Sequence, residues 1–144
     1  MKDFTVMIVD DEEDFCNTLA KRLEKRNLHV LKADGGEAAL AVLNQDPVDV
    51  VVLDVRMQGM DGIEVLRAIK ACNPEVEVVM LTGHASVEAA VQGMALGAFD
   101  YLMKPCEIEQ LMTKVQEATK KKRDHEEKIK EARVREALSA HGLE

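Results

Sequence analysis

Short runs of apolar, mostly β-branched residues alternate with longer stretches of helical periodicity along most of the chain. The apolar runs predict strands at residues 4–9, 28–33, 48–53, 76–81 and 99–103. The stretches that follow them predict helices at residues 15–26, 37–43, 63–71, 87–96 and from 108 onward. The strand runs are nearly continuous in apolar residues and do not alternate with polar ones, which is typical of parallel strands covered by helices on both faces. The pattern therefore predicts an α/β fold, a doubly wound five-stranded parallel sheet.

Several helix ends carry recognisable signals. Asn73 and Pro74 predict the end of the third helix, and Gly97 predicts the end of the fourth. Ser86 suits the N-cap of the fourth helix. These signals place the expected boundaries between consecutive elements.

The last predicted helix is longer than a small domain can cover. No glycine or proline interrupts residues 107–140, and a continuous helix of that length would extend about 50 Å. We therefore expect a compact domain over residues 1–119 and a helical extension or linker over residues 120–144. A heptad seam through the helix is apolar only from Ile108 to Ala118, which predicts a homodimer of modest stability that pairs first through this apolar half.

Composition and charge narrow the function classes. The 144 residues carry a net charge of −8, all of it on residues 1–106, and the chain has one Tyr, three Phe and no Trp. An acidic surface with few aromatic residues predicts no direct nucleic-acid binding. No apolar run approaches the length of a membrane span and no signal-peptide core is present at the N-terminus, so we expect a cytoplasmic protein without a membrane partner. Three cysteines without CxxC spacing predict neither a disulfide framework nor a zinc site.

Polar side chains follow four of the five predicted strands. Asp10 and Asp11 follow the first, Asp54 the third, Thr82 the fourth and Lys104 the fifth. In a doubly wound sheet, chemistry collects beyond the carboxyl ends of the strands. We therefore expect these side chains at one edge of the sheet.

Three carboxylates at one edge require a compensating charge. If the first and third strands are neighbours, Asp10, Asp11 and Asp54 converge, and they cannot all stay ionised without a cation or a proton. Oxygen ligands without nearby His or Cys favour Mg²⁺. Glu12 and Glu13 are interpreted differently, as acidic residues in the first turn of a helix.

The same edge has the parts needed to hold a transferred phosphoryl group. A nucleophilic carboxylate lies beside the expected metal, and Lys104 and Thr82 supply a cation and a hydroxyl donor. The chain has no GxxxxGK[ST] loop, so it is not built to bind a nucleoside triphosphate. A metal-dependent phosphatase with an aspartate nucleophile would want an acid two residues after Asp54, where this chain has Arg56, and that alternative is set aside.

Residues 1 to about 120 resemble a response-regulator receiver domain of bacterial two-component signalling. The resemblance is carried by five motifs in order: Val9-Asp10-Asp11-Glu12, Leu53-Asp54-Val55-Arg56-Met57, Gly59-Met60-Asp61-Gly62, Leu81-Thr82-Gly83-His84 and Gly97-Ala98-Phe99-Asp100-Tyr101-Leu102-Met103-Lys104-Pro105. Gln58 stands where the family usually has a loop proline. The segment from Leu81 to Ala90 is similar to receivers joined to σ54-activating ATPases.

The resemblance implies a flavodoxin-like strand order of 2-1-3-4-5 and a set of site residues. Asp54 would be the phosphoacceptor. Asp10 and Asp11 would hold Mg²⁺ together with Asp54 and the backbone carbonyl of Arg56. The family also implies that the protein is a signalling switch and not an enzyme with a separate substrate, although it catalyses its own phosphorylation and dephosphorylation.

Other residues take roles around the phosphoryl group by the same resemblance. Thr82 and Lys104 would contact it, and the peptide bond from Lys104 to Pro105 is expected to be cis. Thr82 and Tyr101 would form the switch that changes the surface of the fourth helix, fifth strand and fifth helix. Arg56 and His84 would tune the rate of dephosphorylation.

The implied partners are a sensor histidine kinase, which would supply the phosphoryl group from a phosphohistidine, and a downstream protein. The downstream partner, or a second copy of the chain, would bind the switched surface and the tail. Two alternatives stay open for the output. The chain is either a stand-alone regulator or the receiver of a larger DNA-binding transcriptional regulator.

Overall fold

Five parallel strands form one sheet in the computed structural model, which describes residues 4–56, 61–83 and 87–142. The strand order is β2-β1-β3-β4-β5, which confirms the predicted topology. The strands are β1 (Thr5–Val9), β2 (His29–Ala33), β3 (Val50–Asp54), β4 (Glu77–Thr82) and β5 (Asp100–Met103). All five begin one or two residues later than the apolar runs suggested, because the first apolar residue of each run belongs to the loop that enters the sheet.

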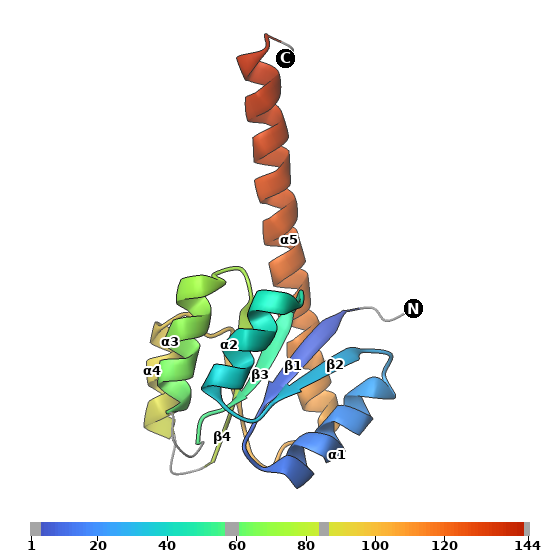
Figure 1. Ribbon diagram of the computed structural model, residues 1–144, viewed down its shortest axis with the longest axis vertical. Coiled ribbons are helices and arrows are strands. Elements are labelled where there is room, and N and C mark those ends of the chain that lie inside the picture. The colour runs from blue at the N-terminus through green and yellow to red at the C-terminus, as the bar shows by residue number, and fades with distance from the viewer. Residues whose placement is uncertain (1–3, 57–60, 84–86, 143–144) are drawn as a thin grey trace.

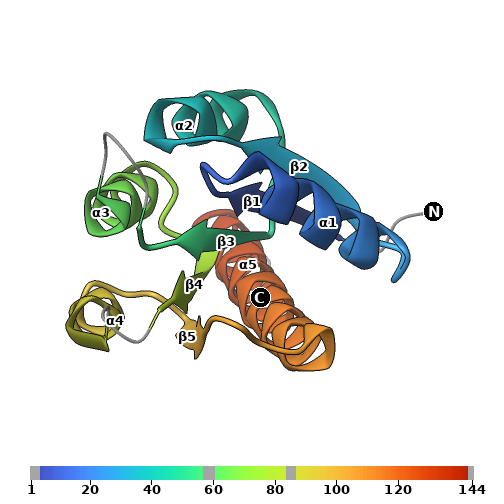
Figure 2. The same ribbon diagram turned by 90° about the horizontal axis from the view of Figure 1, so that it is seen from below.

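Five helices cover the sheet in two layers. They are α1 (Glu13–Glu24), α2 (Gly36–Gln45), α3 (Gly62–Cys72), α4 (Val87–Ala95) and α5 (Ile108–Ala140). Figure 2 shows α1 and α5 on one face of the sheet and α2, α3 and α4 on the other. The doubly wound arrangement is therefore confirmed.

Alternation along the central strands divides the core into two layers. On β1, Met7 and Val9 belong to the cluster under α2 and α3, whereas Val6 and Ile8 belong to the cluster under α1 and α5. All residues of β3 and β4 are buried, but the edge strands β2 and β5 are partly exposed. Burial on both faces, which the sequence predicted for every strand, therefore applies only to the three central ones, because an edge strand has fewer covering neighbours.

The helix ends follow the local signals where these can be compared. Asp61 is the N-cap of α3, and its Oδ1 accepts a hydrogen bond of 3.0 Å from the Ile63 N–H. Asn73 caps the end of the same helix, and Gly97 follows α4 with a φ of +103°, a conformation that favours glycine. The predicted N-cap Ser86 lies outside the described residues.

Helix α5 begins in the core and leaves the domain as a single rod of 33 residues (Figure 1). Leu111, Val115 and Ala118 are at most 1% exposed and pack against the sheet. The prediction that the apolar half of the heptad seam pairs with a second copy is therefore wrong, because the domain's own core occupies that face. Every described residue from Arg123 onward is exposed. No helix in the described ranges is long and apolar enough to cross a membrane.

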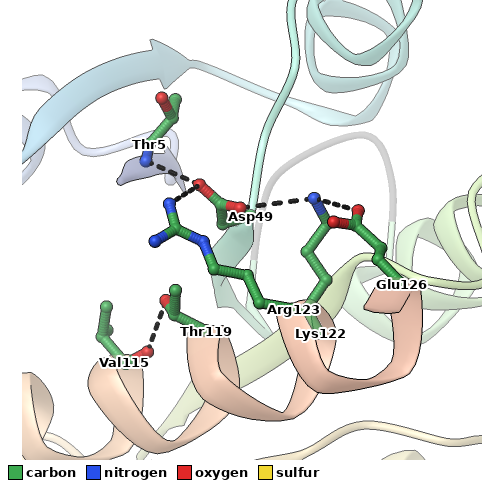
Figure 3. A network of polar contacts seen from close by, with 7 residues as sticks. All are labelled: Thr5, Asp49, Val115, Thr119, Lys122, Arg123 and Glu126. Atoms are coloured by element: carbon green, nitrogen blue, oxygen red, sulfur yellow. Dashed lines mark hydrogen bonds and ion pairs between the residues drawn. The ribbon is translucent and has the colours of Figure 1, made fainter. Parts of the chain in front are cut away.

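Polar contacts fix α5 where it leaves the sheet (Figure 3). Asp49, just before β3, accepts a hydrogen bond of 2.9 Å from the Thr5 N–H through Oδ2. Its Oδ1 lies 3.3 Å from Lys122 Nζ, and Oδ2 lies 3.6 Å from Arg123 Nη2. Lys122 also pairs with Glu126 at 2.7 Å. We call Asp49, Lys122 and Arg123 the α5 anchor; it lies at the end of β3 opposite to Asp54.

Candidate functional site

The polar residues that follow the strands gather at the carboxyl edge of the sheet. Strand register places the end of β1 beside β3, and pairs Asp54 with Leu81 next to Thr82. Thr82 in turn pairs with Met103, the residue before Lys104. Because parallel neighbours end together, side chains that are far apart in the sequence share one edge.

Three carboxylates form a cluster at this edge. One carboxylate oxygen from each of Asp10, Glu12 and Asp54 lies within 4.8 Å of the others. Asp10 and Asp54 are 2% and 5% exposed, respectively, whereas Glu12 is exposed. Oxygen donors of this kind suit a hard divalent cation, so the residues present fit Mg²⁺.

Glu12 was not among the metal ligands expected from the sequence, where it was assigned to the first turn of a helix. It is the N-cap residue of α1, and its N–H donates a hydrogen bond of 2.9 Å to Asp10 Oδ1. This tight turn brings the Glu12 carboxylate back toward Asp10. The signal available in the sequence was its place in the run of acids after the first strand.

Asp11 is placed differently from its neighbours. Its side chain is exposed and is not part of the three-carboxylate cluster. It lines an adjacent cavity of about 480 Å³ together with Asp10, Lys32 and Asp34. Its negative charge still reaches Asp54, because it contributes to the raised pKa of that carboxyl.

Asp54 is a buried carboxyl with a strongly perturbed pKa. Burial is the main cause, and the charge of Asp10 adds to it, so that the pKa of Asp54 rises to about 6. Lys104 and the Arg56 N–H oppose this rise, the latter through a hydrogen bond of 3.2 Å to Oδ1. Perturbation of this kind is typical of functional carboxyls.

Lys104 is the cation of the site. Its Nζ lies 3.1 Å from Asp10 Oδ2 and 3.6 Å from Asp54 Oδ1. Burial lowers the pKa of Lys104, but the hydrogen bond to Asp10 and the charge of Asp54 outweigh it and the net shift is upward. The peptide bond from Lys104 to Pro105 is cis, as expected. The same ammonium lies 4.2 Å from the ring centroid of Phe15, a contact that nothing in the sequence pattern indicated.

Thr82 supplies an unsatisfied hydroxyl. The residue is 1% exposed, and its Oγ1 has no hydrogen-bond partner among the described residues. A buried hydroxyl without a partner is costly and rare. It fits a site that receives an oxygen-rich group beside Asp54.

The remaining predicted site residues lie around this centre. Tyr101, on β5, is 37% exposed, and its N–H donates to Asp100 Oδ1 at 2.7 Å. Arg56 is exposed, and its backbone N–H faces Asp54. His84 and Gln58 lie outside the described residues.

Comparison with known proteins shows which proteins the chain is similar to. A family model described as the response regulator receiver domain matches residues 6–116. The transcriptional regulatory protein ZraR of Escherichia coli (strain K12) is 38% identical over 113 residues, which cover 78% of this chain and 26% of ZraR. A putative response regulator NtrX-like protein of Rickettsia conorii is 37% identical over 130 residues, covering 87% of this chain and 27% of that protein. The chain thus spans about a quarter of the length of these relatives.

A solved structure agrees with the sequence comparison. The crystal structure of the receiver domain of NtrX from Brucella abortus superposes with a TM-score of 0.77 at 33% identity. The match covers 80% of this chain and 98% of that domain. Both the fold and the family of the present chain therefore follow from independent comparisons.

Proposed function

The chain belongs to the response regulator receiver domain family, and on that premise we propose that it accepts a phosphoryl group on Asp54 from the phosphohistidine of a sensor histidine kinase. One observation carries this proposal: the buried Asp54 carboxyl has a raised pKa and lies 3.6 Å from Lys104 Nζ, and the neighbouring strand ends in Thr82, whose hydroxyl has no hydrogen-bond partner among the described residues. A nucleophile, a cation and a hydrogen-bond donor are the groups that phosphoryl transfer requires of a protein.

The transfer is a displacement at phosphorus. A carboxylate oxygen of Asp54 forms the new P–O bond while the P–N bond of the phosphohistidine breaks, and the electron pair of that bond stays on the imidazole nitrogen. Lys104 and Thr82 stabilise the phosphoryl oxygens as charge redistributes over them. The acyl phosphate is later hydrolysed in the same site, which returns the Asp54 carboxylate and inorganic phosphate.

We propose that Asp10, Asp11, Asp54 and the backbone carbonyl of Arg56 hold Mg²⁺, as the family resemblance implies. The proposal is supported by the buried pair of Asp10 and Asp54 and by the influence of Asp11 on the Asp54 pKa. Glu12 lies close enough to join or orient this set. When bound, Mg²⁺ offsets negative charge on the carboxylates and on the phosphoryl oxygens.

The protein thus acts as a signalling switch. Thr82 and Tyr101 connect the site to the surface formed by α4, β5 and α5, on which Val87, Val91 and Met94 are exposed. We propose that this surface and the tail bind a downstream protein or a second copy of the chain. Arg56 and His84 set the lifetime of the phosphorylated state in this proposal.

The proposal also covers how the phosphorylated receiver passes its signal onward. Residues 1–119 act as the receiver, and residues 120–144 act as an extension or linker that carries the signal onward in the cytoplasm. Relatives named as transcriptional regulators favour the reading in which a receiver of this type controls a larger DNA-binding regulator. The competing reading, a stand-alone regulator, predicts that the isolated chain binds a protein partner in a phosphorylation-dependent way.

Labelling with acetyl phosphate tests the proposal. Wild-type protein in Mg²⁺ should take up one phosphoryl group, as measured by intact mass. Asp54→Asn should take up none, and chelation of Mg²⁺ should abolish labelling of the wild type. An Asp54→Asn protein that is labelled to the wild-type level would place the acceptor elsewhere.

A further inference from the structure

We propose that Phe15 is a positioning residue for Lys104: its ring holds the ammonium against Asp10 and Asp54 and thereby sets the rate at which Asp54 is phosphorylated. The inference rests on the proposed function, since it concerns the same acceptor. It adds a residue whose place in the chain, in the first turn of α1, gave no sign of a role in the site.

Among the described residues, the Lys104 ammonium contacts two carboxylates and one aromatic ring. Its nitrogen lies 3.1 Å from Asp10 Oδ2, 3.6 Å from Asp54 Oδ1 and 4.2 Å from the centroid of the Phe15 ring. The last distance is well inside the range in which an aromatic face attracts a cation. Two carboxylates and one ring therefore hold the same charge.

Lys104 needs such a restraint. A lysine side chain is a point charge on a flexible stem. A cavity of about 110 Å³, which Lys104 helps to line, gives the side chain room to turn away from the carboxylates. That cavity is lined mostly by apolar groups, among them Phe15, Leu19, Leu81, Pro105, Ile108 and Leu111. The aromatic face offsets part of the cost of burying the ammonium next to this apolar lining.

Phe15 is itself held in place. It packs against the core cluster beneath α1 and α5, which includes Leu19, Leu81 and Leu111. Phe15 lies five residues after Asp10 in the chain. One short segment therefore carries both the carboxylate that binds Lys104 and the ring that contacts the same ammonium. Movement of the Lys104 head would break both contacts together.

The other phenylalanines provide an internal comparison. The ring centroid of Phe99 lies 5.7 Å from Lys121 Nζ, and the ring centroid of Phe4 lies 5.7 Å from the guanidinium carbon of Arg123. Both contacts are longer than the one at Phe15, and neither cation reaches Asp54 in the described contacts. Phe99 is therefore a matched control for any substitution that changes only the electrons of an aromatic ring.

Site-specific fluorination of Phe15 separates the ring's charge distribution from its packing. Mono-, di- and trifluorophenylalanine keep the shape of the ring closely but progressively weaken its attraction for a cation. The rate constant for phosphorylation by acetyl phosphate should fall stepwise along this series, by about threefold to thirtyfold at its end. The rate constant of the Phe15→Leu variant should fall by a similar factor, whereas Phe15→Tyr should retain the wild-type rate constant. The same fluorination at Phe99 should leave the rate constant unchanged.

A double-mutant cycle ties the effect to Lys104. In a Lys104→Ala background, Phe15→Leu should no longer change the phosphorylation rate, because the group that it positions is gone. A second readout needs neither metal nor phosphodonor: in metal-free protein, the effects of the two substitutions on the urea-unfolding equilibrium should be less than additive.

The outcomes separate this inference from the proposed function. A flat fluorination series, or an equal effect of Phe15→Leu with and without Lys104, would overturn the positioning role while Asp54→Asn still abolishes labelling. Full labelling of Asp54→Asn would instead overturn the proposed acceptor, and the urea cycle would then report on the contact between Phe15 and Lys104 by itself.

Discussion

The ammonium nitrogen of Lys104 lies closer to Asp10 than to the proposed acceptor: 3.1 Å separates it from Asp10 Oδ2, and 3.6 Å from Asp54 Oδ1. The lysine thus links the carboxylate after β1 to the carboxylate at the end of β3. It neutralises part of the charge that a divalent cation would also neutralise. A cation and Lys104 therefore compete for the same acids.

Removal of the Lys104 charge should strengthen metal binding and weaken phosphorylation. Lys104→Met leaves the carboxylates without their nearby cation, so Mg²⁺ should bind about tenfold more tightly, as an order of magnitude for one charge partly screened by solvent. The phosphorylation rate should fall because the phosphoryl oxygens lose a contact. Isothermal titration with MgCl₂ and a labelling time course measure the two effects, and weaker Mg²⁺ binding by the variant would contradict the competition.

The raised pKa of Asp54 makes stability depend on pH. The folded protein holds this carboxyl at a pKa of about 6, above the ordinary value of 3.8, so the penalty for ionising it is absent below about pH 4 and complete above about pH 6. In metal-free protein, Asp54→Asn should raise the free energy of unfolding by about 2 kcal/mol at pH 7.5. The difference should vanish near pH 4. Urea denaturation in a chelator measures both, and a variant less stable than the wild type at pH 7.5 would contradict the assigned burial and charge repulsion.

Gly62 lies where the chain can accept no side chain. A Cβ at this position would lie 2.6 Å from both the Cα and the carbonyl oxygen of Val55, which is backbone that cannot turn aside. Gly62→Ala should therefore destabilise the protein by about 3 kcal/mol. Gly35→Ala is the control, since a Cβ there meets nothing within 4 Å. Thermal or urea unfolding that places the two variants at equal stability would contradict this packing.

The α5 anchor should be needed to keep the extension attached to the domain. The Asp49 and Lys122 side chains are 15% and 11% exposed, so Asp49→Asn should cost about 1–2 kcal/mol of stability. Amide exchange over residues 119–126 should become faster. Asp124→Asn, which removes an exposed pair with Lys120, should change stability by less than about 0.5 kcal/mol. Equal effects of the two substitutions on stability and exchange would show that the anchor is an ordinary surface contact.

The fold and the centre of the candidate site follow closely from sequence patterns. Continuous apolar runs define the strands, and the rule that parallel strands end together brings Asp54, Thr82 and Lys104 to one edge. Contacts that depend on side-chain direction do not follow in this way. Glu12 joins the carboxylates through a backbone turn onto Asp10. Phe15 reaches Lys104 only once folding brings the residues that follow β5 to the first turn of α1.

The long helix shows the same limit in a second place. An uninterrupted helix after residue 107 is predictable from the absence of glycine and proline. Its partners are not, because Lys122 and Asp49 are separated by 73 positions in the chain. Heptad spacing alone also could not distinguish a seam for a second copy from a face buried in the domain's own core, where Leu111 and Val115 lie.

Identifying the phosphorylated residue is the most direct test of the proposal that Asp54 accepts the phosphoryl group. Protein treated with acetyl phosphate and Mg²⁺ is reduced with borohydride, which converts an aspartyl phosphate to homoserine, and is then digested and sequenced by mass spectrometry. Homoserine is expected at position 54 and at no other aspartate. Homoserine at Asp10 or Asp11, or phosphate retained on a residue that borohydride does not reduce, would contradict it.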